Sequence, residues 1–264
     1  MTTNIPKIES KSPLQVVTDL CAWGVILLAG LALLGWLTGL RLLASVFADY
    51  IPMAISTAVS FIIIGSLLLL RHHSWAIKHN FFLATISALF TVFHFINLLV
   101  YFISNGNLTV DVLLFPGNEV LQTFPVNRMS PITAATFFIS ALTLYLLYRT
   151  QGNGGTTDSA ALLGFVVFEV GSISVIGYLY GTPLLYGGSV IPLALTTALA
   201  FTFLGVGLIA ACGADSLVLR LFSGPRLRTR LLRTFLPITT LLILTQGYLR
   251  QFFDQTNINP ALWD

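Results

Sequence analysis

Seven long apolar runs dominate the 264-residue sequence and limit what it can fold into. Only 9% of the residues are charged, whereas a soluble domain usually carries about 25%. A hydrocarbon core of about 30 Å needs roughly 20 apolar residues in a helix. The runs are continuous and lack the short alternating segments of a membrane β-barrel. We therefore predict an all-α, polytopic membrane helix bundle with spans at 14–40, 51–70, 81–102, 129–148, 159–180, 191–212 and 231–252.

The positions of Lys and Arg predict the orientation of these spans. With the N-terminus in the cytoplasm, only Arg41, Arg128 and Arg250 of the 13 basic residues lie outside, which follows the positive-inside rule. The net charge of +3 then reflects topology and not a nucleic-acid partner. Membrane lipids are the expected partners, because the arginines of 226–233 suit anionic headgroups. The resulting parts are a cytoplasmic tail at 1–13, a transmembrane domain at 14–253 and a C-terminal tail at 254–264.

One motif occurs three times, each time near a proline: Pro52, Pro131 and Pro192. A large apolar residue is followed by Thr-Ala, Phe and a small residue at spacings that share one helix face. The segments 35–39 and 177–181, which precede two copies, are also similar, so the chain reads as three like-oriented hairpins plus one helix. We expect the motif to serve helix packing, since Thr and small residues let helices approach closely in lipid. The packing residues are Thr57, Ala58, Phe61 and Gly65, then Thr133, Ala134, Phe137 and Ala141, then Thr197, Ala198, Phe201 and Gly205.

Two ionisable residues, His94 and Glu169, fall well inside predicted spans. Such residues cost at least about 2.5 kcal/mol at the bilayer centre, so they usually face the bundle interior or water. Asn97 lies one turn after His94, and Ser172 lies one turn after Glu169. Both ionisable residues are near the middle of their spans, which allows a His94–Glu169 hydrogen bond. Three interpretations stay open: a structural role, as a neutral hydrogen-bonded pair or as two separately satisfied side chains; a ligand- or proton-sensing site that also includes Arg128; and a haem or metal ligand. A second histidine inside the spans, which the third interpretation would favour, is lacking.

The longest predicted connection, 104–128, lies on the outer side and mixes apolar residues with Asp111, Glu119 and a Pro116-Gly117 turn. This composition is typical either of a segment along the outer interface that caps the bundle or of a solvated connector.

Common catalytic and cofactor motifs are lacking from the sequence: there is no P-loop, dinucleotide fingerprint, HExxH or GxSxG. All three lysines lie outside the spans, so no retinal Schiff base is expected. Cys21 and Cys212 have no metal-binding spacing and are expected to pack in the bundle. We predict neither enzymatic activity nor a metal site, and the sequence does not indicate a cofactor.

The repeated motif, together with Asn-Arg-Met-Ser-Pro-Ile-Thr-Ala at 127–134, resembles the N-terminal multi-helix membrane sensor region of bacterial histidine kinases and diguanylate cyclases. Segments 177–181, 192–205 and 221–225 fit the same pattern. The resemblance implies a signal-transduction module of the bacterial inner membrane, which passes a helix movement to a cytoplasmic output. No kinase, cyclase or PAS region follows within the 264 residues, and an eighth helix would be needed to return the chain to the cytoplasm. The alternative is a structural accessory subunit, in a homodimer or a larger membrane complex.

Overall fold

The computed structural model describes most of the helical part of the chain. The described residues are 12–47, 50–106, 109, 120–121, 124–125, 128–149, 154–180 and 191–223, with isolated helical positions at 231, 234, 238 and 245. Within them the regular secondary structure is helical, apart from a two-stranded antiparallel hairpin of β1 (Val120–Leu121) and β2 (Phe124–Pro125).

Four helices are long and apolar enough to cross a membrane: α1 (Pro13–Thr38), α5 (Asn80–Ile103), α7 (Pro131–Arg149) and α8 (Gly154–Leu179). Two more, α3 (Ile55–Leu70) and α9 (Leu195–Ala211), are apolar but shorter. A membrane helix bundle is therefore confirmed at this level. The seventh predicted span, 231–252, lies outside the described residues except for four isolated positions, so the count of seven stays a prediction.

Helix α8 begins at Gly154, before the predicted start at 159, whereas α3 and α9 begin after the predicted starts at 51 and 191. Residues 51–54 and 191–194 are not helical, and the N-cap residues Ala54 and Ala194 have nearly the same extended geometry, with φ −64° and ψ 151° or 148°. Proline disfavours helical geometry in the residue before it, which accounts for Ile51 and Ile191. Pro131, in contrast, is the first residue of α7.

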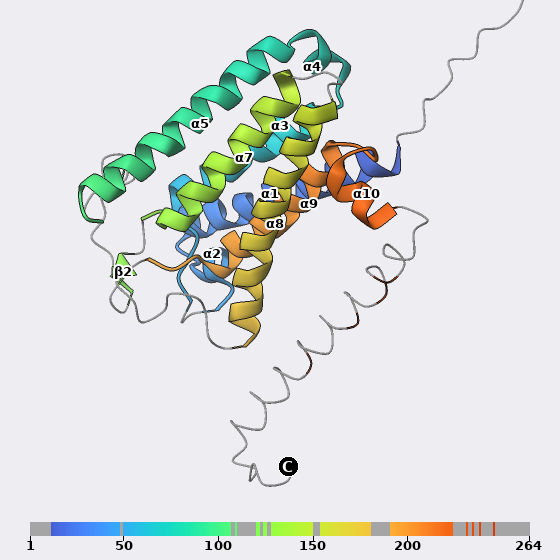
Figure 1. Cartoon of the computed structure of the whole chain (residues 1–264). Coiled ribbons are helices and arrows are strands. Elements are labelled where there is room, and N and C mark those ends of the chain that lie inside the picture. The colour runs from blue at the N-terminus through green and yellow to red at the C-terminus, as the bar shows by residue number, and fades with distance from the viewer. Residues whose placement is uncertain are drawn as a thin grey trace, which may run out of the picture.

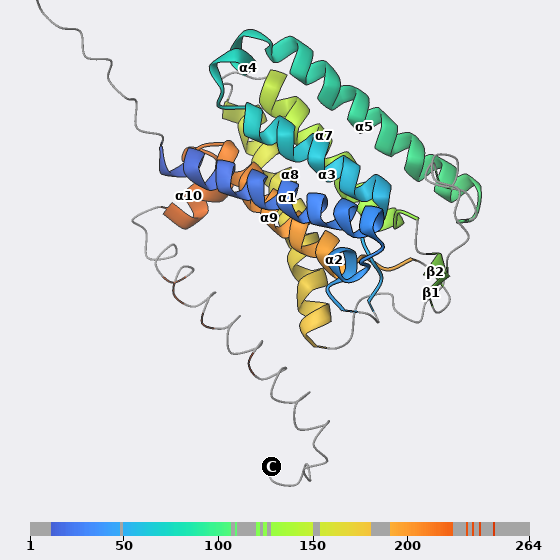
Figure 2. The same cartoon turned by 180° about the vertical axis from the view of Figure 1, so that it is seen from behind.

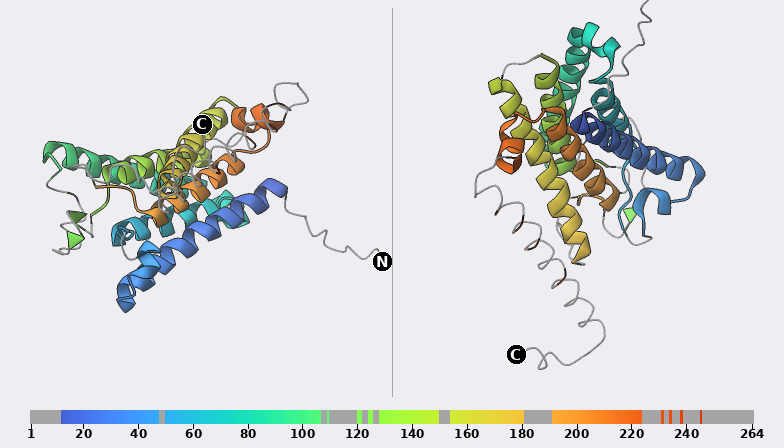
Figure 3. Two further views of the ribbon diagram at one scale, coloured as in Figure 1. Left: turned by 90° about the horizontal axis from the view of Figure 1, so that it is seen from below. Right: turned by 90° about the vertical axis from the view of Figure 1, so that its right-hand side faces the viewer.

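The helices form a bundle around three central members (Figures 1 and 2). Helices α3, α7 and α9 pack against one another. Outside them, α1 lies against α3 and α9, α8 lies against α7 and α9, and α5 lies along α7. Three short helices follow α1, α3 and α9 respectively: α2 (Leu42–Ser45), α4 (Ser74–Lys78) and α10 (Leu217–Ser223). The left view of Figure 3, from below, shows α5 at one side of the bundle and α10 at the other.

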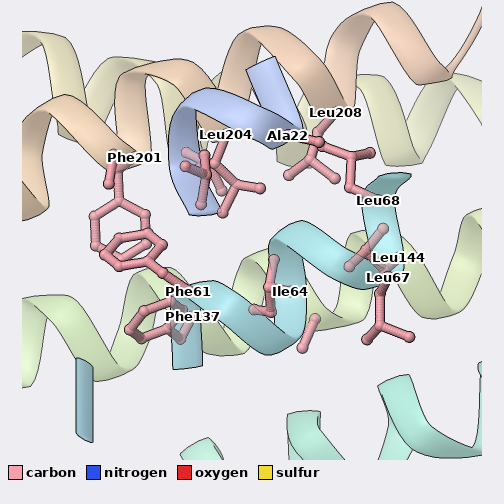
Figure 4. Close-up of a cluster of buried hydrophobic side chains, with 14 of the residues drawn as sticks. Ala22, Phe61, Ile64, Leu67, Leu68, Phe137, Leu144, Phe201, Leu204 and Leu208 are labelled. Carbon is pink, nitrogen blue, oxygen red and sulfur yellow. The ribbon is translucent and has the colours of Figure 1, made fainter. Parts of the chain in front are cut away.

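Three phenylalanine rings meet where the central helices cross (Figure 4). Phe61 lies 4.6 Å from Phe137 and 4.7 Å from Phe201, and the last two are 4.9 Å apart, measured between ring centroids. All three contacts are edge-to-face, which suits the ring quadrupoles, and all three side chains are fully buried. The three repeated phenylalanines therefore form one cluster in the core.

The remaining motif residues also face the interior. Each Thr-Ala pair is buried, and each alanine N–H donates to the carbonyl four residues earlier, at distances of 2.9–3.0 Å. The small residue at the end of the motif lets an outer helix approach closely. A Cβ on Gly65 would lie 2.9 Å from Ile26 Cγ1 of α1, and one on Gly205 would lie 2.5 Å from the Cα of Phe168 of α8. Helices α8 and α9 are thus in backbone contact at Gly205.

Candidate functional site

A cavity of about 460 Å³ lies between α3 and α5. Its size falls within the usual range for small-molecule pockets, about 300–1,000 Å³. It exists because α5 packs along α7 and stands off from α3, whereas α1 and α8 each bridge two central helices. The lining residues are Ser56, Val59, Ser60 and Ile63 from α3, and Ile86, Leu89, Phe90 and Phe93 from α5.

The cavity wall is apolar with a hydroxyl-bearing strip along α3. Ser56 and Ser60 lie one helical turn apart and are the polar residues of the lining. Ser56 Oγ is buried and has no hydrogen-bond partner among the described residues. Leaving a buried hydroxyl unpaired costs about 1–3 kcal/mol, so a bound oxygen or nitrogen atom that pairs with it would gain affinity.

His94 lies directly behind two lining residues. Its ring stacks on Phe137 at 4.9 Å and 24° and meets the rings of Phe90 and Phe93 at 4.7 and 5.1 Å, between centroids. The side chain is fully buried, and neither ring nitrogen has a hydrogen-bond partner in the described part of the chain. An unpaired imidazolium would be very costly in such a place, so His94 is a neutral imidazole.

The other predicted site residues divide into two groups. Asn97 is buried near the start of α7, where its Nδ2 donates to Met129 Sδ at 3.8 Å, and the neighbouring Arg128 is half-buried. Glu169 and Ser172 lie half-buried on α8, and Ser172 Oγ has no partner among the described residues.

The hydrogen bond considered between His94 and Glu169 is not formed, because both ring nitrogens of His94 lack partners. The physical reason is lateral placement: α5 and α8 both pack on α7, and His94 uses its face to stack on Phe137 of that helix (Figure 1). Asp111, Glu119 and the Pro116-Gly117 turn of the predicted outer segment lie outside the described residues.

In two hairpins, an aromatic residue of the outer helix bonds to the chain just before the central helix. Trp36 Nε1 donates to the carbonyl of Met53 at 2.8 Å, and the Tyr178 hydroxyl donates to the carbonyl of Leu193 at 2.7 Å. Trp36 and Tyr178 occupy matching places in the similar segments 35–39 and 177–181. These bonds fix the extended segments 51–54 and 191–194, which precede α3 and α9, against the outer helices α1 and α8.

Arg71 has a role that sequence reasoning missed. It follows the last residue of α3, and its guanidinium donates from Nη1 to the carbonyl of Leu147 at 2.7 Å and from Nε to the carbonyl of Ala211 at 3.4 Å. Those carbonyls lie in the last turns of α7 and α9, so the guanidinium caps two central helices, while the backbone N–H of Arg71 caps the third, α3. Burial lowers the pKa of Arg71, but a guanidinium starts so high that it stays protonated. The signal in the sequence was an arginine directly after a span, which also fits ordinary topology.

A second polar contact fixes α10 beside α8. Asp158 Oδ1 accepts a hydrogen bond from the backbone N–H of Leu217 at 2.6 Å, and Oδ2 pairs with Arg220 at 3.0 Å. Asp158 thereby caps the first turn of α10 from another helix.

Within the described residues, no three His, Cys, Asp or Glu side chains lie close enough together to hold a metal ion. Cys21 and Cys212 are both buried and free. Comparison of the chain with protein-family models, with curated proteins and with solved structures gives no match.

Proposed function

We propose that the chain is a membrane-embedded sensory and signal-transduction module whose stimulus binds between α3 and α5. The observation that carries this proposal is the 460 Å³ cavity, with the Ser56 hydroxyl in its wall and the two ring nitrogens of His94 behind it, none of which has a hydrogen-bond partner among the described residues. We further propose the topology expected from the sequence: seven helices from three hairpins plus one, in a bacterial inner membrane with the N-terminus inside. The matching Ala54 and Ala194 caps and the matching Trp36 and Tyr178 bonds favour the repeat.

The movable element in this proposal is α5. It is the least buried of the four long helices, and the cavity separates it from α3 along part of its length. The proposal gives α5 two arrangements, one held away from α3 and one closed onto it. A ligand that binds only the first arrangement shifts the population toward it through unequal affinity. Because α4 joins α3 to α5, the shift changes the geometry of the loop that contains α4.

A cavity-filling substitution tests this movement without a ligand. Ile63→Trp places a large ring in the cavity and should hold α5 away from α3. Spin labels at Leu37 and Phe102, both exposed at the far ends of α1 and α5, would report the change in nanodiscs, with Cys21 and Cys212 replaced by Ala. We expect the distance distribution to shift by roughly 2 Å or more, the scale of functional rearrangements.

Two controls accompany the test. Phe203→Trp changes the matching position of α9, two residues after its motif phenylalanine and partly exposed, and should leave the distribution unchanged. A second label pair at Leu37 and Leu179 on α8 should not respond to Ile63→Trp. An Ile63→Trp protein that folds but keeps the wild-type Leu37–Phe102 distribution would remove the sensor proposal.

A structural accessory subunit is the second candidate, and the cavity between α3 and α5 favours it as well. In that case a helix of a partner subunit would fill the space between α3 and α5. Native purification from membranes separates the two candidates: a stable complex in which an introduced cysteine at Leu89 crosslinks to another polypeptide would support the subunit role.

A further inference from the structure

The direction of the two helices gives the cavity a polar end and an apolar end. Helices α3 and α5 are joined through α4 and run in opposite directions (Figures 1 and 2). Ser56 in the first turn of α3 therefore lies toward the same end as Phe93, and Ile63 lies toward the same end as Ile86. The hydroxyl of Ser56 is thus at one end and that of Ser60 near the middle, and the end at Ile63 and Ile86 is purely hydrocarbon.

The walls also limit the charge and the size of an occupant. None of the eight lining residues is ionisable, and a charged group buried among them would be strongly disfavoured. A volume of 460 Å³ holds roughly 15 methylene-sized groups, taking the liquid volume of a water molecule, about 30 Å³, as the unit. Val59 and Leu89 are lining residues that are also exposed on the outer surface, so the cavity opens sideways toward the position of the lipid chains.

From these observations we infer that the cavity binds an uncharged single-chain amphiphile: one hydrocarbon chain with a neutral hydrogen-bonding group at its end. Ser56 Oγ is buried in the wall without a partner among the described residues, and a rotation of this side chain about its Cα–Cβ bond lets it pair with the terminal oxygen. The chain runs between α3 and α5 toward Ile63 and Ile86. The inference rests on the proposed function, since it gives the class of ligand for the same site. It does not require that α5 move.

A photoreactive hexadecanol with a diazirine in its chain tests the inference on the full chain in phosphatidylcholine nanodiscs. We expect crosslinks concentrated on the peptides of α3 and α5 that line the cavity. Unlabelled 1-hexadecanol should compete, whereas hexadecane, which lacks the oxygen, and palmitate, which carries a charge, should compete about ten-fold less well.

Matched variants locate the binding. Ser56→Ala should weaken the competition by 1-hexadecanol about five-fold, the usual size of one net hydrogen bond. Ser87→Ala is the control, because that hydroxyl on α5 bonds to the carbonyl of Leu83 at 2.9 Å and does not line the cavity. Ile63→Trp should abolish crosslinking at the cavity peptides and Phe203→Trp should not.

Three results would overturn the inference. Crosslinks spread evenly over all helices would mean contact with bulk lipid only. Equal competition by hexadecane and 1-hexadecanol, with no effect of Ser56→Ala, would mean apolar filling without recognition of the oxygen. Stronger competition by palmitate would mean a charged ligand. None of these results bears on the Leu37–Phe102 distances, which test the movement of α5. Unchanged Leu37–Phe102 distances in Ile63→Trp would likewise leave the crosslinking result valid, so the two proposals can fail separately.

Discussion

At the scale of single residues, Arg71 connects the C-terminal ends of three described helices, α3, α7 and α9. Its two hydrogen bonds join the ends of α7 and α9 to α3, and it faces carbonyls that have no partner within their own helices. The Tyr148 hydroxyl adds a bond from α7 to the carbonyl of Leu67 on α3. This end of the bundle is therefore fixed by side-chain-to-backbone bonds rather than by apolar packing alone.

Arg71→Ala should lower the free energy of unfolding by about 3 kcal/mol, since each lost bond to a charged donor costs about 1.5–3 kcal/mol and the effects overlap. Arg71→Lys keeps the charge but not the planar two-donor geometry, so it should lower the free energy of unfolding by less than Arg71→Ala does. Thermal unfolding in detergent measures both, with the exposed Lys78→Ala as the control. Equal melting temperatures for Arg71→Ala and Lys78→Ala would contradict the capping role.

Phe137 has more ring contacts than the other two motif phenylalanines, because it also stacks on His94. Phe137→Ala should cost about 3–5 kcal/mol of stability, as expected for a large core side chain whose space cannot be refilled. Phe102→Ala, at a residue 68% exposed near the end of α5, should have little effect in the same thermal assay. Similar losses for both substitutions would show that the ring cluster is not the packing centre.

At the scale of elements, the contact of α8 with α9 depends on Gly205. A methyl group there would press on the backbone of Phe168, and backbone atoms cannot move aside as a flexible side chain can. Gly205→Ala should therefore separate the two helices and cost about 1–3 kcal/mol. Gly30→Ala is the matched control: nothing lies within 4 Å of the added methyl, so the change should be neutral or stabilise α1 by up to about 1 kcal/mol. In thermal unfolding, Gly205→Ala should lower the midpoint, and Gly30→Ala should leave it unchanged or raise it.

At the scale of the whole molecule, the bundle has two ends that the proposed topology assigns to different sides of the membrane. Lys78 ends α4 before α5 begins, and Arg128 lies at the start of α7, after the return from the other end of α5. With Cys21 and Cys212 replaced by Ala, a cysteine at Lys78 should react with a membrane-impermeant maleimide only from the cytoplasmic side. A cysteine at Arg128 should react only from the outside. The reverse pattern would invert the proposed orientation.

How much the sequence could predict differs between the fold and the candidate site. The apolar runs located six helices, and the larger errors are at helix starts: α3 and α9 begin later than predicted, and α8 begins earlier, at Gly154. The motif spacing placed Phe61, Phe137 and Phe201 in positions that the structure buries in one cluster. The site was anticipated in part: His94 is buried beside the cavity, but its expected partner Glu169 is on a helix that does not reach it.

The sequence by itself determined the membrane helices and the inward face of the repeated motif, because both follow from local rules. Every backbone polar group in lipid must pair within its own helix, and a residue spacing near four sets which side chains share a face. Only the tertiary structure decided which helices are neighbours. The cap of Arg71 over three helix ends, the separation of α5 from α3 and the stacking of His94 on Phe137 all depend on lateral placement. Helical periodicity does not encode that placement, since one apolar face can pack against any other.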